Sequence, residues 1–389
     1  MRNEVFLDDQ ASLVISPETI YQHFLHHDVF HRFFFLSLIH SRLCLRILLS
    51  FLHPTNNSLP SLEHPFFNQQ STTNNHQIAC LAWLFFCQFQ MPMQPGSTVA
   101  MITPYDKQTG AVNYGELRKL LQMHVQAGTQ NLCILGTTGE SNVVTNDERT
   151  AILKTAVEEV KGQMTILAGT GTINPDSVKG MTQQAMDLGC DASLVVTPYY
   201  VKPPQRYLIQ HFTTMADMGL PVVIYNVPGR TAVNMEDAST AICAQHDNIV
   251  AIKDATGDLA RLPSLKQLLT EQGSDDFLLY SGDDATTLDF VLQGGDGCIS
   301  VTANVAPTEM AQMMAAALNR DAAKATGIND KLQLLHSKLF CESNPIPTKW
   351  ALQRMGIIES DYCRPPLGPM DAETYASIMD EALRLAGKL

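Results

Sequence analysis

The feature that most restricts the fold is a regular recurrence of short apolar runs, rich in β-branched residues, separated by helical stretches. Four successive runs end at residues 197, 225, 253 and 281, a constant spacing of 28 residues. One strand and one helix occupy about this length, so the repeat predicts a closed (β/α)8 barrel. A doubly wound sheet would normally carry a phosphate-binding fingerprint after its first strand, and the sequence has none. The runs are Thr98–Thr103, Leu132–Leu135, Thr165–Gly169, Ala192–Thr197, Val222–Tyr225, Ile249–Lys253, Phe277–Ser281 and Gly297–Val301.

The stretches between the runs have the pattern of amphipathic helices. In Tyr114–Ala127 the apolar residues recur at helical spacing and form one buried stripe. Asn146 is expected to cap a helix over Asp147–Val160, and Asn174 with Pro175 is expected to open a helix that ends at Leu188. We place the barrel at residues 93–306. Residues 307–389 are expected to hold the last barrel helix and a C-terminal helical bundle.

The first 92 residues have a different composition. Residues 1–90 contain 8 of the 12 histidines and 12 of the 16 phenylalanines, but no glycine and no lysine. A folded α/β domain needs glycine in turns and helix caps, so this segment is interpreted as a non-homologous extension that is poorly ordered. It could be an organelle-targeting leader, a true extension, or a start assigned too early, with initiation at Met91 or Met93. We favour the last two.

The bulk properties exclude several classes of function. A net charge of −13 argues against a nucleic acid or an anionic membrane as partner. The longest apolar stretches, roughly 33–52 and 78–89, are interrupted by charges or shorter than the ~20 residues of a membrane span. The nine cysteines show no CxxC spacing, which indicates reduced thiols that mostly fill the core. We expect a cytoplasmic protein, or a plastid stromal one if the extension is a leader.

The most informative single residue is Lys253, which closes the apolar run Ile249–Lys253. A lysine at the end of a buried strand can extend its amine to solvent. Alternatively, burial disfavours the charged form and frees the lone pair to attack a carbonyl carbon. Position alone leaves both interpretations open. The residues that follow the other strands decide between them, because the active site of such a barrel gathers at the carboxyl ends of its strands.

Polar side chains follow three other predicted strands. Gly136-Thr137-Thr138-Gly139-Glu140-Ser141 is either a tight turn or a loop whose hydroxyls and amides hold a carboxylate. Thr197-Pro198-Tyr199-Tyr200 suits packing or an interface better than catalysis. Strand five ends at Tyr225, a phenol able to relay protons, and Arg230 follows on a rigid turn. Arg230 could clamp a substrate carboxylate or form a surface ion pair.

The other strand ends offer no competing chemistry. Asp283 and Asp284 lack a third metal ligand at useful spacing and are interpreted as a helix cap. Ile299–Asn304 is a candidate pocket floor. No metal-binding set, no Ser/His/Asp set and no dinucleotide fingerprint is present. An amine, a phenol, hydroxyls and an arginine at one rim suit imine chemistry on a small keto acid, without metal or organic cofactor.

At these residues the chain resembles the 4-hydroxy-tetrahydrodipicolinate synthases, also called dihydrodipicolinate synthases, which are class I pyruvate aldolases related to N-acetylneuraminate lyase. The resemblance covers about residues 96–389. The family condenses pyruvate with L-aspartate 4-semialdehyde in the diaminopimelate route to lysine. The matching segments are Gly136–Ser141, Thr197–Tyr200, Tyr225–Thr231, Ile252–Gly257, Ser281–Asp284, Ile299–Ala303 and Asn344–Pro347.

The resemblance implies a role for each catalytic position. Lys253 would form the imine with pyruvate, and Tyr225 would relay protons. Thr137 and Tyr200 would be its relay partners, with Tyr200 lent across a dimer interface within a homotetramer.

The resemblance also implies substrate-binding residues. Thr138 would hold the pyruvate carboxylate and Arg230 the semialdehyde carboxylate, while Gly282 and Ile299 would line the pocket. Sialic acid lyases and 2-keto-3-deoxy sugar acid aldolases lack this arginine, so Arg230 favours the synthase over them. A pyruvate aldolase of one of those types, acting on another aldehyde, is the alternative within enzymes. A catalytically silent barrel with a binding role is the alternative outside them.

One departure concerns feedback inhibition by lysine. Of the family's effector-binding positions, Ser141 and Tyr199 look retained. The others are occupied by unlike residues, including Arg149, which a cationic effector would meet. We therefore expect weak or absent inhibition. The substituted positions are Asn146, Arg149, Ile173 and Ser177.

Overall fold

The described residues of this computed structural model are 92–389, and they contain the predicted closed barrel of eight parallel strands. Each strand pairs with the next, and the last pairs with the first. The predictions for the segment before residue 92 lie outside the described residues. The strands are β1 (Gly96–Ala100), β2 (Asn131–Ile134), β3 (Thr165–Gly169), β4 (Ala192–Val196), β5 (Val222–Asn226), β6 (Ile249–Asp254), β7 (Leu278–Ser281) and β8 (Gly297–Ser300).

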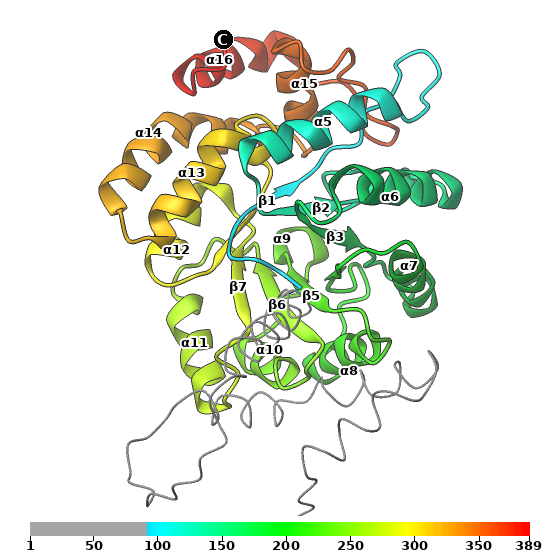
Figure 1. Cartoon of the computed structure of the whole chain (residues 1–389), viewed down its shortest axis with the longest axis vertical. Coiled ribbons are helices and arrows are strands. Elements are labelled where there is room, and N and C mark those ends of the chain that lie inside the picture. The colour runs from blue at the N-terminus through cyan, green and yellow to red at the C-terminus, as the bar shows by residue number, and fades with distance from the viewer. Residues whose placement is uncertain (1–91) are drawn as a thin grey trace, which may run out of the picture. The chain divides into compact units, whose positions relative to one another are not determined.

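One helix follows each strand and lies on the outside of the barrel (Figure 1). Apolar residues of the strands and helices pack between these two layers, and a second apolar cluster fills the barrel interior. In strand order, the barrel helices are α5 (Tyr114–Ala127), α6 (Asn146–Val160), α7 (Pro175–Asp187), α8 (Gln205–Ala216), α10 (Asp237–Cys243), α11 (Arg261–Glu271), α12 (Thr287–Leu292) and α13 (Pro307–Leu318).

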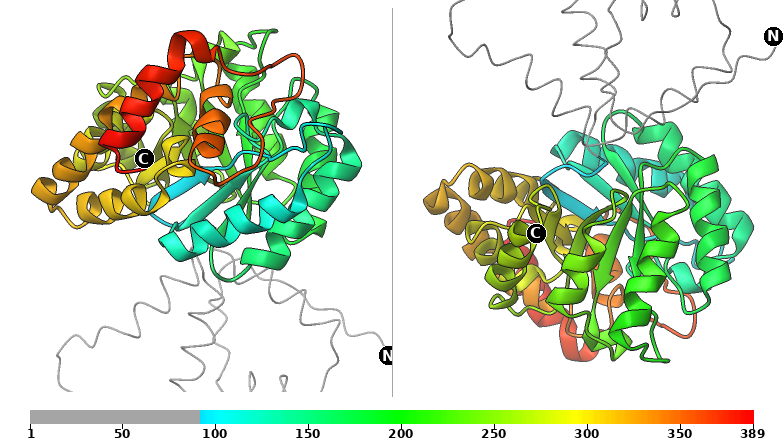
Figure 2. Two further views of the ribbon diagram at one scale, coloured as in Figure 1. Left: turned by 90° about the horizontal axis from the view of Figure 1, so that it is seen from above. Right: turned by 90° about the horizontal axis from the view of Figure 1, so that it is seen from below.

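Three further helices follow the barrel and gather on one side of it (Figure 2). They are α14 (Ala322–Lys338), α15 (Ile346–Arg354) and α16 (Ala372–Leu385). The C-terminal helical bundle was predicted and is confirmed. A single short helix, α9 (Pro228–Thr231), interrupts the connection between β5 and α10. Within residues 92–389, no helix is long and apolar enough to cross a membrane.

The element boundaries differ from the prediction in two instructive places. Asn146 is the first residue of α6 and not its cap. Thr145 is the cap, because its hydroxyl accepts from the Glu148 backbone amide while the Glu148 carboxylate accepts from the Thr145 backbone amide. The first run, predicted to end at Thr103, leaves the sheet after Ala100. The residues beyond it stay buried, so apolar composition alone does not mark the strand end.

Candidate active site

The amine predicted as nucleophile and the phenol predicted as proton relay lie side by side at the carboxyl ends of two adjacent strands. Tyr225 on β5 and Lys253 on β6 are register partners. The Lys253 ammonium lies 4.4 Å from the centroid of the Tyr225 ring, and each residue is 6% exposed. Lys253 thus lies at the base of a cavity and does not extend into solvent.

A glycine makes room for the stem of this lysine. A Cβ atom at Gly282, which follows β7, would lie 2.9 Å from Lys253 Cε and 2.7 Å from the Ala255 Cβ. Contacts this short do not occur, so any side chain here would displace Lys253 or the backbone. The family resemblance implies a pocket-lining role for Gly282, and the geometry gives a physical reason for a glycine here.

Cys133 lines the same part of the cavity as Lys253 and is a competing nucleophile. Burial raises the pKa of its thiol to about 11, and the nearby Lys253 charge only partly opposes this shift. A protonated, buried thiol is unreactive. The Lys253 amine is therefore the stronger candidate nucleophile of the two.

The loop after β2 presents two threonines to the same cavity. It begins after Leu135 and ends at Glu140, and both of these residues have left-handed backbone conformations, with φ of 56° and 54°. The Thr138 side chain is buried, and its hydroxyl oxygen accepts a 2.8 Å hydrogen bond from the Asn344 side-chain amide. This bond leaves the Thr138 hydroxyl proton available for another acceptor.

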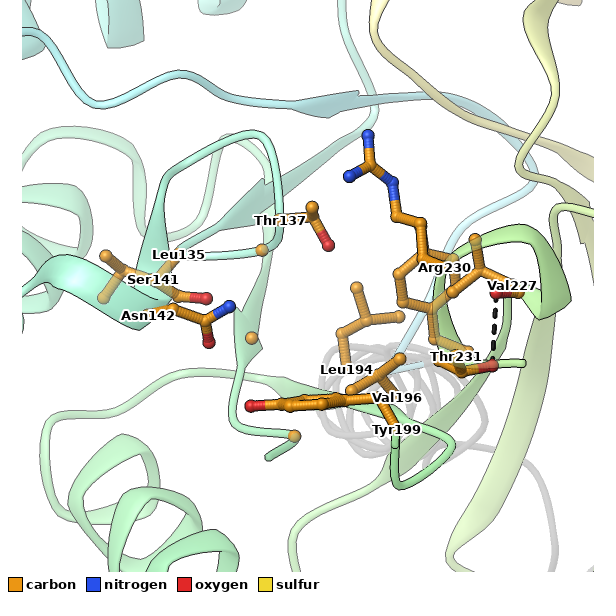
Figure 3. Close-up of a pocket in the computed structure, with 14 residues that line it drawn as sticks. Leu135, Thr137, Ser141, Asn142, Leu194, Val196, Tyr199, Val227, Arg230 and Thr231 are labelled. Carbon is orange, nitrogen blue, oxygen red and sulfur yellow. Dashed lines mark hydrogen bonds between the residues drawn. The ribbon is translucent and has the colours of Figure 1, made fainter. Parts of the chain in front are cut away.

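Arg230 stands on the α9 turn directly after β5. Its side chain is exposed at the cavity mouth, and Figure 3 shows it among the lining residues with Thr137 and Tyr199. The turn is closed by a hydrogen bond from the Thr231 hydroxyl to the Val227 carbonyl oxygen, 3.2 Å long. A guanidinium on a fixed turn can bind a carboxylate with two parallel hydrogen bonds.

The cavity has two adjoining parts that share six lining residues. The first part includes Lys253, Thr138, Gly282 and Asn344. The second extends toward Ser141, Asn142 and Tyr199. The shared residues are Gly136, Thr137, Leu194, Tyr225, Val227 and Arg230.

Two of the predicted site residues do not line this cavity. Ile299 is 1% exposed on β8 and belongs to the apolar cluster inside the barrel, together with Tyr225. Tyr200 is 86% exposed, and its backbone is left-handed with φ of 71°. A tyrosine this exposed, in an unfavourable conformation, is typical of a functional or interface position.

The C-terminal bundle supplies a buried charged residue whose role was not predicted. The Lys349 ammonium on α15 contacts the Glu140 carboxylate, and these side chains are 0% and 1% exposed. Lys349 also donates to the Tyr362 carbonyl oxygen at 2.9 Å and lies 4.2 Å from the Tyr105 ring centroid. Burial lowers the pKa of Lys349, and Glu140 opposes this shift. The pair ties the threonine loop to the bundle.

The aspartates after β7 were interpreted as a helix cap. Asp283 accepts from the Thr286 backbone amide and caps the short 3-10 helix Asp284–Thr286. Asp284 instead accepts from the backbone amides of Val301 and Thr302 at 2.9 and 2.8 Å. Among residues 92–389, no cluster of His, Cys, Asp and Glu side chains has the arrangement of a metal site.

The predicted effector positions are partly brought together. Ser141 and Tyr199 border the second part of the cavity. Arg149 is 3% exposed and donates a 2.7 Å hydrogen bond to the Gly169 carbonyl oxygen. Burial lowers its pKa to about 10. The expected direct contact between Arg149 and an effector is therefore not supported by its position in this chain.

Known proteins similar to this chain belong to one family of enzymes, and the similarity covers the whole barrel and the C-terminal helices. The sequence profile of the Dihydrodipicolinate synthetase family matches residues 93–384. The 4-hydroxy-tetrahydrodipicolinate synthase of Alcanivorax borkumensis is 45% identical over 295 residues, which is 76% of this chain and 98% of the relative.

Two solved structures are similar over the same part of the chain. One is the chloride-inhibited dihydrodipicolinate synthase of Acinetobacter baumannii complexed with pyruvate (42% identity, TM-score 0.72, 76% of this chain and 99% of that one). The other is described as the first monomeric dihydrodipicolinate synthase variant (36% identity, TM-score 0.73, 76% and 98%). The family profile matches residues 93–384, and the Alcanivorax relative matches over 76% of this chain and 98% of its own length, so the chain belongs to the dihydrodipicolinate synthetase family.

Proposed function

We propose that this chain catalyses the 4-hydroxy-tetrahydrodipicolinate synthase reaction, the condensation of pyruvate with L-aspartate 4-semialdehyde through a Schiff base on Lys253. The observation that carries the proposal is the contact of Lys253 with Tyr225 at the base of a cavity whose mouth holds Arg230. Membership of the family and the pyruvate complex of the Acinetobacter relative support it.

The reaction begins at the Lys253 amine. Its lone pair attacks the ketone carbon of pyruvate, and loss of water gives an imine. The imine withdraws electrons, so a proton leaves the pyruvate methyl group and an enamine forms. The enamine carbon adds to the aldehyde carbon of the semialdehyde. The amino group of the adduct then attacks the imine carbon, which closes the ring and releases Lys253.

The proton transfers are assigned to Tyr225, with Thr137 as its partner in the cavity. The carboxylate of pyruvate is assigned to Thr138, because the bond from Asn344 leaves the Thr138 hydroxyl proton free to donate to a negatively charged acceptor. Arg230 is assigned to the semialdehyde carboxylate. Gly282 keeps space for Lys253, and Ile299 packs in the apolar cluster that also holds Tyr225.

Tyr200 is assigned to the proton relay of a second copy of the chain, within a homotetramer built from dimers. Three exposed residues of one segment support an interface here, since Tyr200, Val201 and Tyr207 are 86%, 57% and 53% exposed. Large apolar side chains in one patch are typical of a surface that another protein covers.

The proposed biological role is lysine biosynthesis through diaminopimelate, in the cytoplasm, or in the plastid stroma if residues 1–92 act as a leader. In this proposal residues 93–306 form the catalytic barrel. Residues 307–389 complete it, because Asn344 and Lys349 reach the threonine loop.

Trapping with borohydride tests the mechanism. Reduction in the presence of pyruvate should leave a stable adduct at Lys253, located by peptide mass spectrometry. An unmodified Lys253 would contradict the proposal. Turnover with aspartate semialdehyde, and none with N-acetylmannosamine, would separate this activity from that of a sialic acid lyase. An adduct that forms without turnover of any aldehyde would indicate a barrel with a binding role.

A further inference from the structure

A ring of polar side chains lies behind the two catalytic strands, on the side away from the cavity. It begins with the residues that directly follow Tyr225 and Lys253, namely Asn226 and Asp254, which are register partners. Side chains alternate along a strand, so these two point outward while the catalytic pair points inward. Asn226 is fully buried, and the Asp254 side chain is 9% exposed.

Asn226 closes the loop that carries Arg230. Its side-chain amide donates to the Asn234 side-chain oxygen at 2.8 Å, and its own oxygen accepts from the Met235 backbone amide at 3.0 Å. The segment between these anchors is the α9 turn with Arg230 on it. Both ends of the Arg230 loop are therefore fixed to the end of β5.

Arg261, the first residue of α11, joins this loop to the strand that carries Lys253. Its Nε donates to the Asp254 carboxylate at 2.8 Å. Its Nη1 lies 3.4 Å from the Asn234 side-chain oxygen, and its Nη2 donates to the Met235 carbonyl oxygen at 2.9 Å. Its Nη2 also lies 2.8 Å from the Asp237 carboxylate. One planar guanidinium thus contacts Asp254 on β6 and also Asn234 and Met235, which follow the Arg230 loop.

We propose that Arg261 is a positioning residue that sets the distance between Arg230 and Lys253, and so decides how well the second substrate is held. The inference rests on the proposed function. Pyruvate is assigned to Thr138, in the loop after β2, and to Lys253 on β6, and neither residue lies on the Arg230 loop. The binding of pyruvate should therefore not depend on this ring. The semialdehyde must reach from Arg230 to the enamine on Lys253. The binding of the semialdehyde should therefore depend on the ring of polar side chains.

Lysine cannot replace this arginine. Its single nitrogen can neutralise Asp254 and Asp237 but cannot also reach Asn234 and Met235 in the fixed geometry of a guanidinium. Arg261→Lys therefore separates charge from position. It should keep the stability of the fold while losing the constraint on the Arg230 loop.

The test compares wild type, Arg261→Gln and Arg261→Lys in the full chain. Arg354→Gln is the control, since Arg354 also joins two elements through an ion pair, with Asp380, away from the cavity. Both Arg261 variants should raise KM for the semialdehyde about tenfold or more, because small misplacements of a binding group are costly. KM for pyruvate and borohydride trapping at Lys253 should stay within about twofold. The control should match wild type.

A parallel rise of both KM values, or no change in either, would overturn the inference. A second readout does not depend on activity. Hydrogen exchange of the backbone amides at residues 227–234 should be faster in Arg261→Gln than in wild type, and equal exchange would also overturn it. If wild type fails to turn over the semialdehyde, the proposed function is wrong, and the exchange measurement still decides whether Arg261 holds the loop.

Discussion

The Lys253 ammonium contacts the ring of Tyr225, 4.4 Å from its centroid, across a pair of register partners on β5 and β6. The contact is made by the ring face, which attracts a cation through its quadrupole. Removing only the phenol oxygen therefore leaves the contact intact while removing the group proposed to relay protons. This separation makes the role of Tyr225 testable without disturbing Lys253.

Tyr225→Phe should lower kcat by about 10²–10⁴-fold, the usual contribution of general acid–base catalysis. The adduct with pyruvate should still form, but more slowly. Steady-state kinetics and borohydride trapping measure the two effects. Tyr280→Phe is a matched control, because Tyr280 on β7 is also a register partner of Lys253. Its hydroxyl donates a 2.7 Å hydrogen bond to the Gln94 carbonyl oxygen. An unchanged kcat in Tyr225→Phe would contradict the assignment.

Gly282→Ala should abolish adduct formation at Lys253, because the added methyl group would lie 2.9 Å from Lys253 Cε. Gly229→Ala serves as control, since a methyl group there meets no atom within 4 Å. Mass spectrometry after borohydride reduction gives the result for both variants. Equal labelling of Gly282→Ala and wild type would mean that Lys253 has more freedom than the packing indicates.

The barrel could be predicted from the sequence because its repeat is local. Each strand and helix fits one unit, and the ends of β4 to β7 were predicted to within one residue. The rim residues followed from the same logic, since Thr137, Arg230 and Lys253 each come directly after or at the end of a strand. Their gathering around one cavity is a property of barrel geometry and needs no long-range information.

The supporting residues could not be predicted in the same way. Asn344 reaches Thr138 from 206 residues away, and Lys349 reaches Glu140 from 209 residues away. Such contacts depend on how the C-terminal bundle packs, which periodicity does not specify. One signal was present, because Lys349 interrupts the otherwise uncharged segment Ile346–Leu352. A lysine in such a segment needs a partner when it is buried.

The Glu140–Lys349 pair is expected to matter for stability chiefly through the cost of breaking it. Lys349→Met leaves a buried carboxylate without its partner and should reduce the free energy of unfolding by about 3–5 kcal/mol. Glu140→Gln combined with Lys349→Met removes both charges and should recover most of this loss. Denaturant unfolding of the three proteins measures the difference. A double variant as unstable as Lys349→Met would show that packing, and not charge, is responsible.

Tyr200→Ala should weaken self-association and lower kcat together, if Tyr200 completes the relay of a second copy. Sedimentation velocity and activity measured over a dilution series report both effects. Leu385→Ala on α16 is a suitable control, because Leu385 is also exposed, at 56%. An assembly unaffected by Tyr200→Ala, with full activity, would exclude the proposed interface at this residue.

Acid should destabilise the fold through His124, which is 1% exposed on α5 and 3.1 Å from the Thr129 hydroxyl. Burial lowers its pKa from 6.5 to about 3, so protons bind the unfolded chain more tightly. Its contribution is therefore complete above pH 6.5 and is lost as the pH falls toward 3, at about 1.4 kcal/mol per pH unit. His124→Gln should flatten the dependence of unfolding free energy on pH over this window.

His211, whose pKa burial lowers to about 4, should add a similar slope over a shorter range of pH. A variant that lacks both histidines should lose the sum of the two slopes. Equal slopes for wild type and His124→Gln would place the acid sensitivity on other groups.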